Sequence, residues 1–213
     1  MKLLFLADTH TQHMQVEIKE PVDYLIFAGD GEFDRLNRII GFNNWLQELK
    51  DDNLIKEAIV ICGNHDLYPQ SKKKEVKRLF TAAKYLENDS IKLSNGMKLY
   101  GSPYTSIFMD WGFMLSDKEL EENWKKIPKD CDILVTHGPA YGYLDFDNRN
   151  GNLGCKHLSA AIQKIKPKIH AFGHIHRDVG QRRILETETT KFINCGVLDN
   201  WYNMIWEPII VEV

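Results

Sequence analysis

The sequence predicts an α/β fold, a two-sheet mixed β sandwich flanked by helices in αββα layers. Short apolar runs recur along the chain and are typical of strands that are covered on both faces. Amphipathic segments with a helical period separate several of these runs. A hairpin signal and a strand-rich carboxyl-terminal part then interrupt the alternation, which favours two mixed sheets with helices outside them.

Five apolar runs are the first predicted strands, and each of them leads directly into a polar motif. In open α/β sheets, functional groups collect just beyond the carboxyl ends of the strands. We therefore expect the five polar motifs to share one edge of the molecule. The runs are residues 3–7, 24–28, 58–62, 133–135 and 169–172.

Helices are expected between these strands. Residues 33–50 and 72–86 carry apolar side chains at largely helical spacing. Ser116 followed by Glu119 forms a capping-box pattern, which predicts that a helix begins there. Residues 158–165 form another amphipathic segment, which stops before a proline.

Two regions break the alternation of strands and helices. Asn95-Gly96 lies between the strand-like residues 91–93 and 97–100, and Asn-Gly is a strong hairpin signal. Near the end of the chain, three further segments are predicted to form antiparallel strands. They are residues 184–185, 191–194 and 204–213.

Composition limits the class of protein. A chain of 213 residues favours one domain, residues 1–213, and can bury a sizeable core without disulfide bonds or structural metal ions to stabilise it. The net charge of -3 counts against a broad nucleic-acid surface. None of the four cysteines stands at Cys-x-x-Cys spacing, so buried reduced thiols and a cytoplasmic location are expected. No apolar run approaches the ~20 residues of a membrane span, so no membrane partner is expected.

The polar motifs supply seven potential metal ligands. Imidazole nitrogen together with carboxylate or amide oxygen suits Mn, Fe, Zn, Ni or Co. Seven ligands are too many for one ion, whereas one carboxylate between two sets of three would serve two divalent ions. Two-metal sites catalyse in-line displacement at phosphorus, so the sequence predicts a phosphoesterase. The ligands are Asp8, His10, Asp30, Asn64, His137, His174 and His176.

Other phosphate and ester chemistries lack their motifs. The chain has no Gly-x-x-x-x-Gly-Lys-Ser/Thr loop and no Gly-x-Gly-x-x-Gly after a strand. It also has no Gly-x-Ser-x-Gly elbow, which removes the usual serine hydrolase interpretation.

The order of the motifs resembles the calcineurin-like metallophosphoesterase superfamily. The five blocks are Asp8-Thr9-His10, Gly29-Asp30, Gly63-Asn64-His65-Asp66, Thr136-His137-Gly138 and Gly173-His174-Ile175-His176. A closer likeness is to the metallophosphoesterase-domain-containing group, and it rests on Pro139 after the fourth block, residues 142–145 and residues 167–176. Members of that group resemble class III cyclic nucleotide phosphodiesterases. The resemblance implies hydrolysis of a small phosphodiester, such as a cyclic nucleotide, through metal-activated hydroxide.

The resemblance also implies roles for the ligands. The first ion would take Asp8, His10 and His176, and the second would take Asn64, His137 and His174. Asp30 would bridge them, and Mn is the preferred metal.

Two further residues of the third block are expected to be catalytic. His65 resembles the family histidine that contacts the phosphate, as a general acid or as a cationic stabiliser. Asp66 would orient His65 or a metal ligand by hydrogen bonding, without binding a metal itself. Substrate-binding residues are not identified, but the aromatic stretch from Tyr104 to Phe113 could stack a nucleobase or cap the core. Arg177 could meet a phosphate or lie on the surface.

The sequence leaves other functions open. The signature of protein serine/threonine phosphatases is Gly-Asp-x-x-Asp-Arg-Gly. In this chain the second Asp comes one residue later than in that signature and Leu36 replaces the last Gly, which counts against such a phosphatase. A nuclease acting on DNA or RNA is the nearest enzymatic alternative, and a catalytically silent metal-binding interaction module is the other. The short segment between His10 and Asp30 predicts only a stub of a first crossover helix. The oligomeric state is not indicated.

Overall fold

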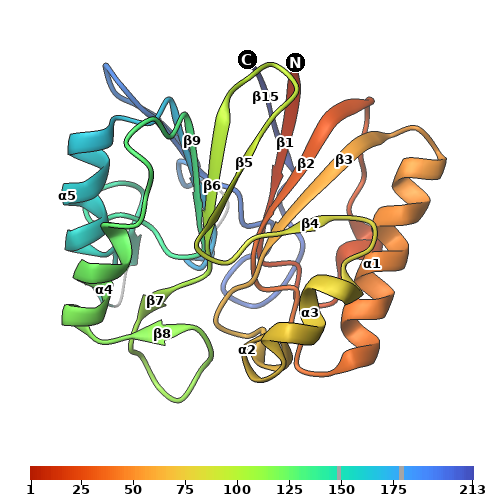
Figure 1. Cartoon of the computed structure of the whole chain (residues 1–213), viewed down its shortest axis with the longest axis horizontal. Coiled ribbons are helices and arrows are strands. Elements are labelled where there is room, and N and C mark those ends of the chain that lie inside the picture. Colours follow the sequence, from red (N-terminus) through yellow and green to blue (C-terminus); the bar gives the residue numbers. More distant parts are fainter. Residues whose placement is uncertain (148–149, 178–179) are drawn as a thin grey trace.

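Two β-sheets pack face to face between two layers of helices in the computed structural model of this protein (Figure 1). The structure describes residues 1–147, 150–177 and 180–213. One sheet has the strand order β15-β1-β2-β3-β4 and the other has the order β13-β14-β12-β9-β6-β5. Both sheets are mixed, so the predicted α/β sandwich of αββα layers is confirmed.

The first sheet is built around β1, whose parallel neighbour is β2 and whose antiparallel neighbour is β15. Three of its strands are those predicted from the first three apolar runs. Its strands are β1 (Lys2–Leu6), β2 (Val22–Ala28), β3 (Ile55–Ile61), β4 (Lys84–Tyr85) and β15 (Ile209–Glu212).

The second sheet holds the predicted hairpin at one edge, where β5 pairs antiparallel with β6. In its centre, β6, β9, β12 and β14 are parallel neighbours. Its strands are β5 (Asp89–Lys92), β6 (Lys98–Ser102), β9 (Ile133–Thr136), β12 (Ile169–Phe172), β13 (Ile184–Glu186) and β14 (Lys191–Asn194). Two short ribbons lie outside the sheets: β7 (Thr105–Ser106) with β8 (Met114–Leu115), and β10 (Phe146–Asp147) with β11 (Gly151–Asn152).

Helices cover the outer faces of both sheets. On the first sheet lie α1 (Leu36–Asp51), α2 (Leu67–Ser71) and α3 (Lys73–Leu79), and on the second lie α4 (Asp117–Trp124) and α5 (Lys156–Ile165) (Figure 1). The predicted capping box starts α4, since the Ser116 backbone N–H donates to the Glu119 carboxylate at 2.8 Å. The first crossover is the predicted stub, a single 3-10 turn η1 (His13–Gln15).

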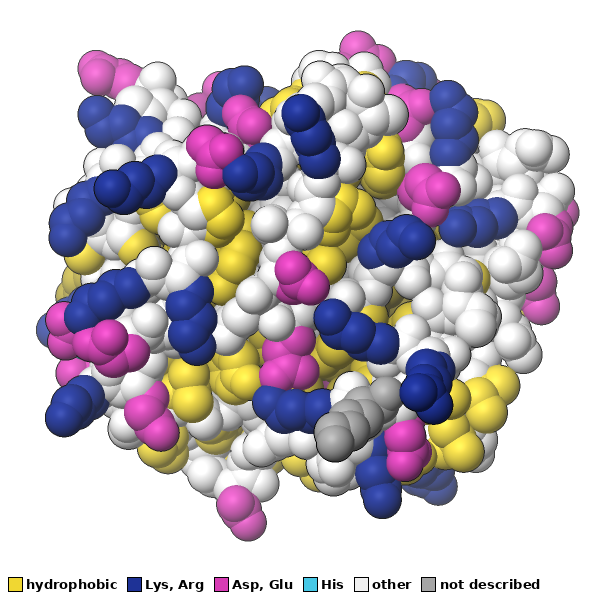
Figure 2. Space-filling view, in the orientation of Figure 1, with side chains coloured by type: hydrophobic (Ala, Val, Ile, Leu, Met, Phe, Trp, Pro, Cys, Tyr) yellow, Lys and Arg dark blue, Asp and Glu magenta, His cyan; other side chains and the backbone are white. Residues whose placement is uncertain are grey.

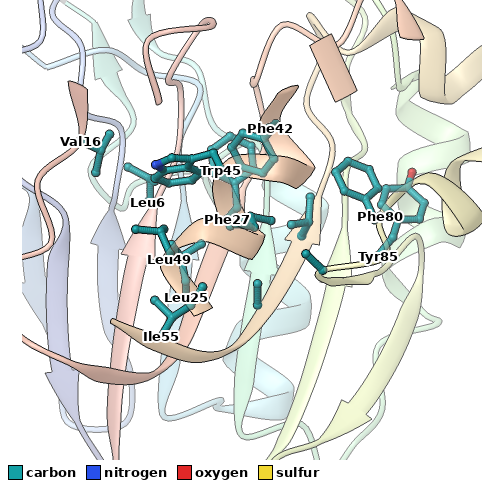
Figure 3. Packing of buried hydrophobic residues seen from close by; sticks show 14 of the residues in the cluster. Leu6, Val16, Leu25, Phe27, Phe42, Trp45, Leu49, Ile55, Phe80 and Tyr85 are labelled. Carbon is teal, nitrogen blue, oxygen red and sulfur yellow. The ribbon is translucent and has the colours of Figure 1, made fainter. Parts of the chain in front are cut away.

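Three apolar clusters hold the layers together: one under α1, one between the sheets and one under α4 and α5. In the cluster under α1, Phe42 and Trp45 lie over Leu6 and Phe27 of the first sheet (Figure 3). The Phe27 and Phe42 rings are 4.7 Å apart. This packing explains why α1 forms where the apolar residues have a helical period, because burying such a face stabilises a helix more than local propensity does.

Two predicted elements were wrong in extent. The helix predicted over residues 72–86 ends at Leu79, and Lys84–Tyr85 forms β4 instead, pairing with β3. The Phe80 and Tyr85 rings stack at 5.6 Å, so these apolar residues pack in the core without a continuous helix. The strand predicted over residues 204–213 is confined to β15, and β14 is antiparallel only to β13.

The surface carries charges of both signs. On the face shown in Figure 2, Lys and Arg side chains are interspersed with Asp and Glu, without a large field of one sign. Among the helices formed by the described residues, none has the length and apolar character needed to cross a membrane.

Candidate metal centre

The carboxyl ends of β1, β2, β3, β9 and β12 meet where the two sheets join. There Ala7, which follows β1, bridges in parallel to Gly196, which follows β14. The backbone N–H of Ala7 donates to the Cys195 carbonyl at 2.9 Å, and that of Val197 donates to the Ala7 carbonyl at 3.2 Å. The polar motifs after the five strands are thereby drawn to one edge of both sheets.

One group of donors consists of Asp8, His10 and His176, each of which offers a ligand atom within 4.8 Å of the other two. The His10 and His176 rings are 5.4 Å apart. Asp8 is fully buried and His10 is nearly so. The backbone N–H of His174 donates to the two Asp8 carboxylate oxygens at 3.0 Å, which holds this carboxylate in place.

A second group gathers around the side-chain oxygen of Asn64. His137 Nε2 lies 2.8 Å from Asn64 Oδ1, and His174 Nδ1 lies 2.7 Å from the same oxygen. The His137 and His174 rings are 5.1 Å apart. Two imidazole nitrogens and one amide oxygen therefore face one small volume.

Asp30 lies between the two groups. Its Oδ2 is 3.2 Å from His137 Nε2 in the second group and 3.8 Å from His10 Nε2 in the first. Its other oxygen, Oδ1, accepts the backbone N–H of His65 at 2.8 Å. All seven residues predicted as ligands are thus together, with Asp30 in the middle position.

Backbone strain is concentrated at this edge. Asp8, His10, Asp30 and His174 have φ of 53°, 39°, 58° and 69°, in the left-handed region. Asp, Asn and His enter this region more readily than most residues, but each visit still costs energy. The packing of the strand ends holds these turns in place, which points the side chains toward one another.

Glycine is needed where the backbone runs against the carboxylates. A Cβ on Gly63 would lie 2.3 Å from Asp30 Oδ1. On Gly196 it would lie 2.4 Å from Asp8 Oδ2, and on Gly173 2.5 Å from the same oxygen. These close approaches leave no room for a side chain, so the glycines in the motifs serve packing as well as turning.

Two backbone carbonyls set the orientation of the histidines. His137 Nδ1 lies 2.9 Å from the Ala28 carbonyl, and His176 Nδ1 lies 2.9 Å from the Asp199 carbonyl. A carbonyl can only accept, so each Nδ1 carries a proton and Nε2 is the atom that would bind a cation. Burial on its own would lower the pKa of His137, but the charge of Asp30 raises it to about 9, so a cation there would displace the Nε2 proton of His137. The Asn194 side chain also donates to the Ile175 carbonyl at 2.7 Å, which fixes the last motif.

Electrostatics favour a cation at Asp30. Burial on its own would raise the pKa of Asp30, but the charge and hydrogen bond of His137 hold that pKa well below its usual range. Burial lowers the pKa of His10 to about 3 and that of His174 to about 3. Both imidazoles are therefore neutral near pH 7 and can offer a lone pair.

Buried polar atoms without hydrogen-bond partners also indicate that this donor set suits divalent ions. His10 Nε2 is buried and, among the described residues, has no hydrogen-bond partner, and the same holds for Asn64 Nδ2. A buried polar atom without a partner is costly, and a cation beside His10 Nε2 would remove that cost.

The comparison with known protein families agrees with this geometry. Residues 1–178 match the model of the calcineurin-like phosphoesterase family.

The chain belongs to that family.

A human protein named metallophosphoesterase domain-containing protein 1 is 30% identical over 239 residues, covering 100% of this chain and 71% of the human one. A UPF0046 protein of Caenorhabditis elegans is 30% identical over 245 residues, covering 100% of this chain and 60% of its own length. The crystal structure of TT1561 of Thermus thermophilus has a TM-score of 0.63 at 12% identity, covering 92% of this chain and 88% of that one, and shares the fold. This chain is a metal-dependent phosphoesterase.

Next to the metal centre, the phosphoesterase has a cavity of about 440 Å³. Asp30, Asn64, His65, His174 and His176 line it at the metal centre. His65 is half-buried, with its ring 5.0 Å from the ring of His10 and 4.7 Å from that of Trp111. This position puts the His65 imidazole beside the proposed ligands.

Asp66 lies behind the metal centre of the phosphoesterase. It is fully buried, and its carboxylate accepts the backbone N–H groups of Gly63 at 2.7 Å, Phe33 at 2.8 Å and Asp30 at 3.0 Å. Burial, followed by the charge of Asp30, raises the pKa of Asp66 to about 7. Its hydrogen bonds go to backbone amides of the two loops that carry Asp30 and Asn64, so it positions those loops.

The aromatic stretch divides between two roles. Phe113 is buried in the cluster under α1, whereas Phe108 is exposed and Trp111 lines the cavity. Arg177 is not on the surface and is not among the residues that line the cavity: it is buried and donates to the carbonyls of Leu144 and Phe146.

One residue of the site has no signal in the sequence motifs. The Tyr202 ring lies 4.7 Å from that of His10 and 5.1 Å from that of His176, both edge-to-face. It reaches the phosphoesterase site from a loop far beyond the last motif, held by the Gln12 side chain, which donates to the Tyr202 carbonyl at 3.0 Å.

Proposed function

We propose that this phosphoesterase is a dinuclear phosphodiesterase that hydrolyses a small phosphodiester such as a cyclic nucleotide. The observation that supports this best is the arrangement of donors on both sides of Asp30, with His10 Nε2 at 3.8 Å and His137 Nε2 at 3.2 Å from the same oxygen. One carboxylate oxygen between two donor groups suits a bridge between two cations.

The residues that would hold the ions follow from the two groups. Asp8, His10 and His176 would bind the first, Asn64, His137 and His174 the second, and Asp30 both. The mixture of imidazole and oxygen donors suits Mn, Fe, Zn, Ni or Co, and we propose Mn. Two such ions supply Lewis acidity, which makes a nucleophile of water near neutral pH and neutralises phosphoryl oxygens.

The residues of the chain then orient the reaction. The backbone N–H of His65 holds Asp30 Oδ1, so Asp30 keeps Oδ2 toward the donors. The His65 ring, half-buried at the cavity wall, can protonate or stabilise the departing ester oxygen. The Ala28 and Asp199 carbonyls keep His137 and His176 in the required tautomers.

The lining of the cavity favours a diester over a monoester. Among the described residues that line it, none is Lys or Arg. A monoester dianion bears more charge than a diester monoanion, so its binding depends more on Lys or Arg side chains, which this lining lacks. The cavity also extends past the metal centre and leaves room for a second ester group.

The cell compartment and the domain boundaries are part of the same proposal. All four cysteines are free thiols, which supports a reducing compartment, and we propose the cytoplasm. The two sheets share one apolar cluster between them, which supports a single domain over residues 1–213.

The test is hydrolysis of bis-p-nitrophenyl phosphate and of p-nitrophenyl phosphate by metal-stripped protein refilled with Mn. We expect metal-dependent turnover of the diester above that of the monoester. Asp30→Ala should abolish turnover and lower the bound Mn below two ions per chain. Asp34→Ala is the matched control, because Asp34 is in the same loop but pairs with Arg35 and Arg38. Preference for the monoester would contradict the proposal.

A further inference from the structure

We infer that the substrate carries an apolar or aromatic second ester group, which binds in the part of the cavity that lies away from the metal centre. This inference rests on the proposed function and adds the chemical class of the substrate to it. Its starting point is that one cavity of about 440 Å³ joins the proposed ligands to a set of apolar side chains.

The apolar part of the lining, here called the apolar arm, comes from four separate parts of the chain. They are the β7–β8 loop, the end of α4, the segment after β9 and the start of α5 with the residues before it. The apolar arm consists of Ile107, Phe108, Trp111, Trp124, Pro139, Leu153 and Leu158.

The side chains of the apolar arm offer few polar groups to a ligand, while polar groups of the same cavity come from Tyr104, Thr105, Ser106 and Asn150 beside it. The indole N–H of Trp124 is already donated to Cys155 Sγ at 3.2 Å. Leu158 is 1% exposed and packs in the cluster under α4 and α5, so this end of the cavity is a wall of the core. A ligand group in this space gains free energy by leaving water, and an apolar group gains most.

Charge argues against a second phosphate in the same place. Within the described lining, the carboxylates are Asp30 at the metal centre and Asp147 at the β10–β11 ribbon, and none of the residues is Lys or Arg. A nucleic-acid strand needs Lys or Arg along its phosphates. The lining therefore suits one phosphate at the metal centre and an uncharged remainder.

Two aromatic rings restrict the direction in which that remainder can lie. Tyr202 packs edge-to-face against both His10 and His176 and covers the side of the first donor group. Trp111, which belongs to the apolar arm, lies 4.7 Å from His65. An ester group on a phosphate held by the proposed ligands would therefore pass Trp111 to reach the rest of the apolar arm.

Exposed apolar side chains mark the entrance to the same space. Ile107 is 63% exposed, Phe108 59% and Leu153 42%. Three large apolar side chains facing solvent around one cavity are typical of a ligand-binding surface. A bound apolar group would cover part of each of them.

The experiment compares two phosphinates that cannot be hydrolysed. Dimethylphosphinate and diphenylphosphinate carry the same single charge, and their carbon–phosphorus bonds do not break. Titration calorimetry with the Mn-loaded protein gives both dissociation constants without turnover. We expect diphenylphosphinate to bind about tenfold more tightly or better, because two rings replace two methyl groups in the cavity.

Three variants locate the preference. Leu153→Ser and Trp111→Ala should lower the diphenyl-to-dimethyl affinity ratio by about threefold or more. Phe146→Ser is the matched control, because Phe146 lies in the β10–β11 ribbon that Leu153 directly follows, is 52% exposed and is not in the lining. It should keep the wild-type ratio.

The possible outcomes separate this inference from the proposed function. Equal affinities for the two phosphinates, no binding of either, or an equal loss in Phe146→Ser would overturn the inference. Hydrolysis of bis-p-nitrophenyl phosphate is measured independently. A protein that hydrolyses this diester but binds both phosphinates equally would retain the proposed function and lose the inference.

Discussion

The carboxylate of Asp66 accepts the backbone N–H of Asp30 at 3.0 Å. With the same oxygen it accepts the N–H of Gly63, and with the other the N–H of Phe33. One buried side chain therefore ties the loop after β2 to the loop after β3. The two loops carry Asp30 and Asn64, so the spacing of the two donor groups depends on Asp66.

Replacing Asp66 with Asn should destabilise the metal-free protein. The amide keeps only one acceptor oxygen, and its NH₂ would face a backbone N–H that stays buried. We expect the free energy of unfolding to fall by about 2–4 kcal/mol, the cost of buried donors without partners. Urea unfolding measures this loss. Asp52→Asn, at the exposed end of α1, should change stability by less than about 0.5 kcal/mol, and an equal loss there would refute the explanation.

A methyl group on Gly196 should weaken the first metal position selectively. Its Cβ would lie 2.4 Å from Asp8 Oδ2, so the Asp8 carboxylate must move away from His10 and His176. We expect Gly196→Ala to bind the first Mn at least about tenfold more weakly, while the second donor group keeps its ion. Metal titration followed by elemental analysis distinguishes one bound ion from two.

Gly41→Ala is the control for that substitution. Gly41 is an exposed residue within α1, and a Cβ there would meet nothing within 4 Å. Alanine should stabilise this helix by up to about 1 kcal/mol and leave the Mn content unchanged. A loss of Mn in Gly41→Ala would mean that the effect at Gly196 is not local.

His65→Ala should slow the reaction without removing metal. The side chain lines the cavity and its ring is beside the ligands, while its backbone N–H, which holds Asp30, remains in the variant. We expect kcat to fall by ~10²–10⁴ with Mn content unchanged. If His65 is a general acid, kcat should fall more for a phenyl ester than for a p-nitrophenyl ester, because phenolate is the poorer leaving group and depends more on a proton from His65. An equal fall for both esters would favour the cationic stabiliser.

His170 should make the metal-free protein less stable in acid. Burial lowers the pKa of His170 to about 3, below the ordinary value of 6.5. The stability associated with this neutral imidazole is complete above pH 6.5 and is lost as pH falls from 6.5 towards 3, where only the unfolded chain binds the proton. The slope is about 1.4 kcal/mol per pH unit for this one proton.

The variant His170→Gln isolates that contribution from other buried histidines. Thr136 Oγ1 donates to the Gly138 carbonyl at 2.7 Å, so His170 Nε2 donates its proton to Thr136 Oγ1 at 2.8 Å, a bond that the Gln amide can replace. Urea unfolding between about pH 7 and about pH 5 should give a shallower pH dependence in the variant. An unchanged slope would show that His170 does not resist protonation.

The gathering of the seven proposed ligands at one edge could be predicted because each of them follows a strand whose sequence is plainly apolar. Leu3 to Ala7, for example, are all buried, so the strand is visible as a continuous apolar run and Asp8 marks its end. Parallel strands in one sheet end at the same edge, and this rule assembles distant motifs without any knowledge of contacts.

The sequence could not predict the parts of the site that depend on packing across the molecule. The Asp199 carbonyl holds His176, but any residue type offers a carbonyl, so position 199 carries no signal. Tyr202 reaches His10 only because the two sheets join through Ala7 and Gly196. The misjudged helix over residues 72–86 has the same cause, since Lys84–Tyr85 pairs with β3 in spite of a helical pattern.

The carbonyl of Asp199 also determines where a working fragment of this protein can end. A fragment stopping at residue 178, the last residue matched by the family model, would retain all seven proposed ligands. It would lose the acceptor for His176, the glycine that packs on Asp8 and the ring over His10. It would also lose β13 and β14 from one sheet and β15 from the other. A shortened or circularly permuted version of this enzyme must therefore keep residues 191–212, although none of them is a ligand.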